Sequence, residues 1–149
     1  MLVYSRMKSV GVQKQGEDRR VVSGVLEDEL YAMECEIAVH WPTLNIEAVQ
    51  TRMKRFTTAG CLKAGEVFAR AEGRKLGPEL DGMIKKEIGR HGCRHMAILM
   101  VDCCRAVARA EFARELRAAL DADPSTNPAD VLNDFQERHP DLKGYLRPT

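Results

Sequence analysis

The sequence predicts an α+β domain in which a three-stranded antiparallel meander is followed by three to four helices. The first observation is that extended patterns lie between residues 21 and 56, whereas helical patterns follow from residue 61 on. The second is their order, because strands that precede helices, rather than alternating with them, are typical of α+β proteins. The third is length, since 149 residues are enough for one domain with an ordinary core.

The single domain is predicted to span residues 19–138. Residues 1–18 mix glycine, lysine, glutamine and serine without periodicity, so we expect a flexible N-terminal tail there. The last helical pattern ends at His139-Pro140, so we expect residues 139–149 to form a C-terminal tail.

Three segments have the pattern of strands. The clearest is 33–41, where apolar and polar residues alternate with the period of two that marks a half-buried strand. A strand at 21–26 is predicted before it and another at 46–56 after it. An acidic turn at 27–29 and a proline-containing turn at 42–45 separate them. Turns this short favour an antiparallel meander with one face on the core.

The second half of the chain has the pattern of helices. The first predicted helix starts at Cys61 and has Leu62 and Phe68 on its apolar face. Gly77-Pro78 ends that helix and begins the next, as glycine after a helix and proline at its first turn commonly do. The predicted helices therefore cover residues 61–76, 78–88, 93–120 and 127–138.

Charge and composition argue against several kinds of partner. The 23 basic and 22 acidic residues leave a net charge of +1, which creates no long-range field for nucleic acid or anionic lipid. No segment has the length and apolarity of a signal peptide or a membrane span, so we expect a cytoplasmic protein that does not enter the membrane. The five cysteines are an odd number without a disulfide spacing, and are interpreted as thiols, metal ligands or core residues.

A candidate metal site is predicted from Cys61 and from the cluster His91-Gly92-Cys93-Arg94-His95. Both cysteines stand at predicted helix starts, where the helix dipole and free N–H groups favour a thiolate. If the two junctions meet, Cys61, Cys93 and His95 supply three ligands for zinc or iron. His91, a carboxylate, water or a second molecule would supply the fourth. The spacing by itself favours cysteines that only pack at helix starts, so this interpretation stays open beside the metal site.

The other three cysteines are predicted to fill the core. Cys35 falls on the apolar face of the middle strand, and Cys103 and Cys104 lie mid-helix, about three turns below Cys93. Asp102 is seven residues after His95 and so shares its helical face, which makes it a candidate distant partner of that imidazole.

The stretch from Gly24 to Phe112 resembles a bacterial family of small proteins known only as a domain of unknown function. The resemblance rests on residues 24–28, the strand at Met33, residues 46–53, Cys61 and the motif Gly92-Cys93-Arg94-His95-Met96. In that family the motif usually reads Gly-Cys-Thr-His-Leu, and a His-Asp pair often precedes the strand. Tyr31-Ala32 stands at the position of that pair here.

The layout is also similar, more distantly, to that of the iron–sulfur cluster assembly scaffolds. Those proteins place one cysteine in the turn after the strand meander and another at the start of a long helix. Cys61 matches the turn cysteine and Cys93 the helix-start cysteine, while Gly92 stands where the scaffolds have a histidine. The likeness implies a scaffold-like fold and an iron–sulfur cluster or a metal ion as cofactor.

These observations favour a metal-ion or iron–sulfur binding protein that acts as a carrier, sensor or assembly helper. Such a helper implies a protein partner, and a homo-oligomer is compatible with the sequence. The alternatives are a metal-free interaction module with structural cysteines and a thiol-dependent enzyme. An enzyme is less favoured, because no acid/base or nucleophile constellation is complete.

Overall fold

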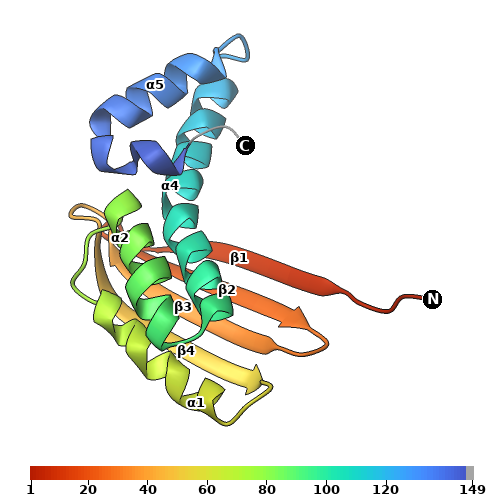
Figure 1. Ribbon diagram of the computed structural model, residues 1–149. Coiled ribbons are helices and arrows are strands. Elements are labelled where there is room, and N and C mark those ends of the chain that lie inside the picture. Colours follow the sequence, from red (N-terminus) through yellow and green to blue (C-terminus); the bar gives the residue numbers. More distant parts are fainter. Residues whose placement is uncertain (147–149) are drawn as a thin grey trace.

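The computed structural model describes residues 1–146 and has an α+β fold, which confirms the predicted class (Figure 1). Four strands form one antiparallel sheet in the order β1-β2-β3-β4. The strands are β1 (Arg6–Gln15), β2 (Arg19–Asp28), β3 (Ala32–His40) and β4 (Asn45–Arg55). The meander and its three predicted strands are therefore present, but the prediction of three strands is wrong.

The additional strand, β1, lies in the segment predicted as a flexible tail. It pairs with β2 along its whole length, with Val12 opposite Val22. Gly16, in the tight turn between them, has a φ of +66°, a left-handed conformation that glycine adopts without steric cost. Only Val10 and Val12 of β1 are half-buried, and the rest of the strand is exposed. An edge strand with so little burial lacks the alternation by which strands are recognised in a sequence.

The helical half is more broken than the sequence predicts. The segment predicted as one helix over 61–76 is a short helix followed by a 3₁₀ segment that ends at Ala71. The next helix contains a π-helical turn over Ile84–Ile88. The helical elements are α1 (Gly60–Ala64), η1 (Gly65–Ala71), α2 (Pro78–Met83), η2 (Ile84–Ile88), α3 (Gly89–His91), α4 (Arg94–Ala122), α5 (Pro128–Arg138) and η3 (Pro140–Tyr145).

The helices cover one face of the sheet. Helix α4 crosses β1, β2 and β3, and η1 lies against β4. Helix α4 and β2 lie close together at Gly24, where an added Cβ would be 2.5 Å from the Cys103 Sγ. The opposite face of the sheet carries exposed side chains such as Ser23, Glu36 and Gln50. The hydrophobic core therefore lies between the sheet and the helical layer.

A buried ion pair joins α4 to the sheet. The guanidinium of Arg20, on β2, donates to the carboxylate of Glu111, and both side chains are almost fully buried. The same guanidinium donates to the carbonyls of Glu17 and Arg19 at 2.9 and 3.0 Å, and it lies over the Trp41 ring. These contacts compensate a charge that would otherwise be costly to bury.

The C-terminal elements pack on the second half of α4 and on α2. Leu142 and Tyr145 of η3 are buried, so the predicted C-terminal tail is ordered through the described residues. The Tyr145 hydroxyl donates to Asp81 at 2.8 Å and accepts the Gly77 N–H at 2.9 Å. Sequence periodicity does not reveal η3, because its burial depends on a helix some sixty residues earlier. No helix within residues 1–146 combines the length and apolarity needed to cross a membrane.

Candidate functional site

The two predicted cysteine junctions lie at the same end of the sheet. Strand β4 ends at Arg55, and a short loop leads from it to α1, which carries Cys61. Cys93 is the N-cap residue of α4, in an extended conformation with φ −121° and ψ 123°. In Figure 1, α1 and the first turn of α4 both lie near the end of β4.

Gly92 brings these junctions into contact. A Cβ built on Gly92 would lie 2.8 Å from the carbonyl oxygen of Ala64 and 3.0 Å from a ring carbon of the buried Phe68. Only glycine allows so close an approach of the two backbones. Because Ala64 is the last residue of α1, the residue before Cys93 touches the short helix that carries Cys61. The start of α4 therefore touches the end of α1, whereas the convergence of the Cys61, Cys93 and His95 side chains stays a prediction.

Cys61 is partly exposed and has a polar environment. Its Sγ lies 3.5 Å from the Thr58 Oγ1, and its backbone N–H donates to the Thr58 carbonyl at 3.1 Å. Hydrogen bonds from the Thr58 side chain and backbone lower the pKa of the thiol below its ordinary value, against a smaller opposing effect of burial. A lowered pKa favours the thiolate form, which is the form that binds a metal or reacts as a nucleophile.

Cys93 and the two histidines face different surroundings. Cys93 is partly buried against the core. The His95 ring lies on the Tyr31 ring, with centroids 4.5 Å apart and an angle of 32° between the planes. His91 is exposed at the end of α3. Tyr31 comes from the turn between β2 and β3, so His95 leans toward that turn.

The four predicted ligands do not form a ready-made metal cluster. Within residues 1–146, no group of three or more histidine, cysteine, aspartate or glutamate side chains is arranged to hold a metal ion. The His95 ring instead packs at a tilt against the Tyr31 ring.

The remaining candidates have structural roles. Cys35, Cys103 and Cys104 are buried, which confirms the prediction that they fill the core. A hydrogen bond with the Cys35 thiol, together with burial, raises the pKa of Cys103, and burial raises that of Cys104. Asp102, predicted as a distant partner of His95, instead forms an ion pair with Lys8 at 2.5 Å. Lys8 belongs to the strand that the sequence did not reveal, so this pairing was not foreseeable.

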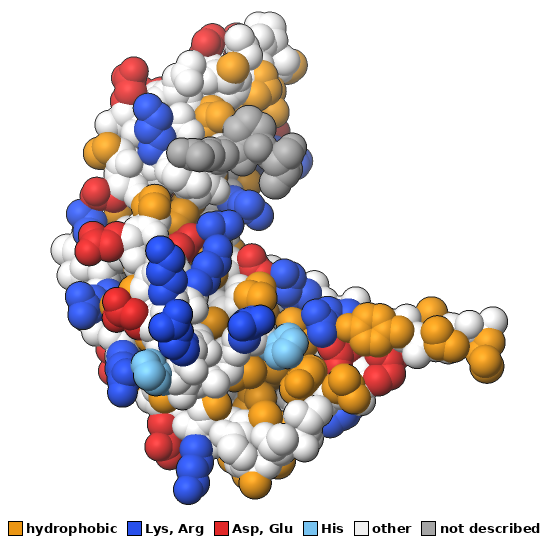
Figure 2. Space-filling view, in the orientation of Figure 1, with side chains coloured by type: hydrophobic (Ala, Val, Ile, Leu, Met, Phe, Trp, Pro, Cys, Tyr) orange, Lys and Arg blue, Asp and Glu red, His pale blue; other side chains and the backbone are white. Residues whose placement is uncertain are grey.

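The sequence also missed a set of exposed apolar side chains at this end of the sheet. Leu62, predicted on the core face of its helix, is 56% exposed, because α1 is too short to bury it. Figure 2 shows apolar side chains gathered on this part of the surface. The sequence did contain one indication of this surface, the two large apolar residues Leu30-Tyr31 in the turn after β2. We call these exposed apolar residues the apolar rim; they are Leu30, Phe56, Leu62 and Ile98.

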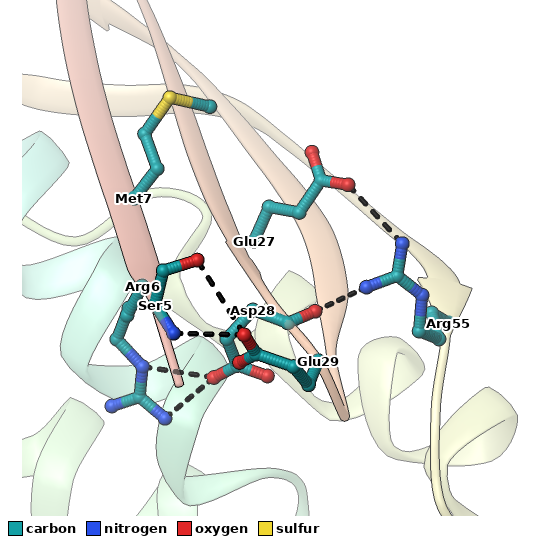
Figure 3. A pocket seen from close by; sticks show the side chains of 7 residues that line it. All are labelled: Ser5, Arg6, Met7, Glu27, Asp28, Glu29 and Arg55. Atoms are coloured by element: carbon teal, nitrogen blue, oxygen red, sulfur yellow. Dashed lines mark hydrogen bonds and ion pairs between the residues drawn. The ribbon is translucent and has the colours of Figure 1, made fainter. Parts of the chain in front are cut away.

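A cavity of about 400 Å³ beside this rim is filled with compensating charges (Figure 3). The Asp28 carboxylate accepts from the Arg6 guanidinium at 2.7 and 2.9 Å and from the N–H groups of Leu30 and Tyr31 at 2.8 Å. Burial opposes the charge of Asp28, but these hydrogen bonds outweigh it and hold the pKa at about 2. Arg55 donates to the Asp28 carbonyl and to Glu27. The ion pairs and hydrogen bonds that line the cavity therefore fix the turn that carries Tyr31.

The fold and site define a small α+β protein with two partly exposed thiols beside an apolar rim, at one end of an antiparallel sheet. Residues 5–110 match the model of a protein family described as Protein of unknown function (DUF2889), and the chain belongs to this family. The match includes the whole sheet and all four predicted ligands, and it ends within α4. No curated protein and no solved structure matches the chain. The scaffold likeness therefore stays an interpretation of the sequence.

Proposed function

We propose that this protein binds a soft transition-metal ion, zinc or iron, or an iron–sulfur species, and passes it on or senses it. Cys61 and Cys93 are the primary donors in this proposal, with His95 and His91 as the nitrogen donors that join them. The observation that supports it is the contact of Gly92, the residue before Cys93, with Ala64, the last residue of the short helix that carries Cys61. Both thiols are also partly exposed, so an ion can reach them.

An incomplete donor set suits a carrier better than a structural site. Structural zinc sites are closed by four protein ligands, whereas sites that exchange a ligand keep a position open. Two cysteine ligands beside an apolar rim leave coordination positions that a partner protein or a small thiol can fill. A carrier or assembly helper uses such positions to receive and release its ion.

The present orientation of His95 does not oppose the proposal. An aromatic pair such as His95 and Tyr31 is worth about 0.5–1.5 kcal/mol beyond its buried area. Metal binding at a complete thiolate–imidazole site contributes about 10–16 kcal/mol in zinc-finger peptides. Divided among four ligands, this is about 2.5–4 kcal/mol for each metal bond, which still exceeds the cost of turning the imidazole away from Tyr31.

Metal analysis tests the proposal. Protein purified without oxygen, or reconstituted with Zn²⁺ or Fe²⁺ under reducing conditions, is expected to retain a stoichiometric amount of metal after desalting. Replacing both Cys61 and Cys93 by serine is expected to abolish this retention. Cys104→Ala is the control, because it removes a fully buried thiol of α4, eleven residues after Cys93, and leaves both proposed thiol ligands in place. Circular dichroism checks that each variant is folded.

Two outcomes contradict the metal proposal. One is wild-type protein that binds neither ion at micromolar concentration. The other is retention of metal by the Cys61→Ser/Cys93→Ser variant, which would place the ligands elsewhere.

The apolar rim favours a second candidate, a metal-free interaction module. Leu62 and Ile98 are large, exposed and close to the two junctions, as expected of residues that a partner covers. If no metal binds, this candidate predicts association that depends on the rim. Sedimentation of the wild type against Leu62→Asp tests self-association through it, with Leu2→Asp as a control on an equally apolar but terminal residue.

A further inference from the structure

Strand β1 forms one edge of the sheet and is exposed along its outer side. In the order β1-β2-β3-β4 its only strand neighbour is β2. It is ten residues long, so its free edge presents a row of backbone N–H and C=O groups that no strand within residues 1–146 satisfies. An edge of this length is a template for one more strand.

Helix α4 projects beyond the sheet on this side and forms the wall of a groove. The groove measures about 550 Å³ and is lined by Val10 and Val12 of β1 and by Ala106, Arg109 and Ala110 of α4. Figure 2 shows the surface hollowed between the sheet edge and the C-terminal half of α4. The Lys8–Asp102 ion pair crosses from strand to helix at one end of the groove.

The apolar side chains that line the groove are only half-buried. Val10 and Val12 point to the helical side, as their partners Gly24 and Val22 do, but they are only half-buried. Ala106 and Ala110 are also half-buried. On the interior strands, the residues of the same face are fully buried beneath α4. One further strand beside β1 would complete the burial of all four side chains.

We infer that the groove between β1 and α4 binds an extended segment of a partner protein by strand addition to β1. Backbone hydrogen bonds to the free edge supply general affinity, as in other cases of strand addition. Two apolar side chains of the segment, at alternate positions, face Val10, Val12 and the two alanines. An acidic side chain beside them pairs with Arg109.

The charges in the groove favour a segment that carries an acidic residue. Lys8 is paired with Asp102, and Arg105 with Asp81. Arg109 is exposed in the groove lining and forms no ion pair within residues 1–146. An acidic residue on the incoming strand therefore finds an unused cation. Because small alanines line the helical wall, the groove accepts branched side chains such as valine and isoleucine.

A second copy of the chain fits the groove less well. If two copies of β1 paired antiparallel about Gly11, Val10 of one would face Val12 of the other. The same register sets Lys8 of one copy opposite Lys14 of the other, and like charges directly opposite each other destabilise a strand pair. The strand β1 also contains no acidic residue for Arg109.

The experiment is a titration of the full chain with synthetic peptides, followed by amide NMR. Each peptide alternates valine with threonine and carries one glutamate, and the position of the glutamate differs from peptide to peptide. A scrambled peptide with adjacent valines is the negative control. We expect saturable shifts at the amides of β1 and at Ala106 and Ala110. Arg109→Glu is expected to weaken binding at least about fivefold. Ala110→Arg is expected to block the groove, because it puts a long side chain on the half-buried helical wall, while arginine keeps a high helix propensity. Arg70→Glu, a matched charge reversal on η1, is expected to bind as the wild type.

Each other result overturns the inference. No saturable binding of any peptide at millimolar concentration excludes a strand-addition site. Shifts centred on the apolar rim or on the outer sheet face place binding elsewhere. Equal effects of Arg109→Glu and Arg70→Glu would show that net charge alone is responsible. A sedimentation dimer with β1 amides already protected from exchange would identify a second copy as the occupant.

Discussion

The contact of Gly92 with α1 leads to a sharp prediction for Gly92→Ala. The new Cβ would lie 2.8 Å from the Ala64 carbonyl oxygen, 3.0 Å from the Phe68 ring and 3.1 Å from the Ile88 carbonyl oxygen. Two of these neighbours are backbone atoms and the third belongs to a fully buried ring, so none can move cheaply. Overpacking of this kind costs about 1–3 kcal/mol of unfolding free energy.

Thermal and urea denaturation measure the effect. For a chain of this size each 1 kcal/mol lowers the melting temperature by about 2–4 °C, so we expect Gly92→Ala to melt about 2–12 °C below the wild type. Gly82→Ala is the matched control: its Cβ would meet nothing within 4 Å, and alanine in a helix is favoured over glycine by about 1 kcal/mol. Unchanged stability of Gly92→Ala would refute the inferred contact between the two junctions, and with it the main support for a shared thiol site.

Three further predictions follow from other contacts. Truncating Arg20 to alanine removes the buried partner of Glu111 and leaves its carboxylate only the more exposed Arg114, at 2.8 Å. The loss in urea titrations is expected to approach the about 3–5 kcal/mol of a broken buried ion pair, whereas replacing Arg20 and Glu111 by methionine and leucine should cost much less; equal losses would contradict the pairing. Asp28 has a folded pKa of about 2 against an ordinary 3.8, so its contribution to stability is complete above pH 4 and is lost as the pH falls toward 2. The free energy of unfolding, measured between pH 4 and 2, should therefore depend less on pH in Asp28→Asn than in the wild type. An unchanged pH profile would contradict the low pKa of Asp28. Iodoacetamide should modify Cys61 first among the five thiols, at a rate that Thr58→Val lowers, as mass spectrometry of peptides can measure; faster labelling of a buried cysteine would contradict the lowered pKa.

The predicted elements succeeded where burial is high. Strand β3 has neighbours on both sides and a helix above it, so its alternation is strong and its predicted bounds are close to the observed Ala32–His40. The helix start at Cys93 was also found, because a glycine break precedes a long helical pattern. Strand β1 was missed because an edge strand is held by backbone pairing, which leaves little trace in side-chain type.

The candidate site was predictable only in part. The sequence located both thiols at helix starts and separated them from the three buried cysteines. It did not reveal that the His95 ring lies on Tyr31, because that contact joins residues from the β2–β3 turn and from α4. The apolar rim was missed for a related reason, since Leu62 has a core-like position on a helix that proves too short to bury it.

The amino-acid sequence by itself determined the α+β class, the buried face of the central strands and the placing of Cys61 and Cys93 at two junctions. These properties depend on local periodicity and on glycine and proline, which act within a few residues of each other. Only the tertiary structure decided that β1 completes the sheet, that Gly92 touches α1 and that the imidazole of His95 leans toward Tyr31. Each of these depends on contacts between segments distant along the chain, whose geometry no local pattern contains.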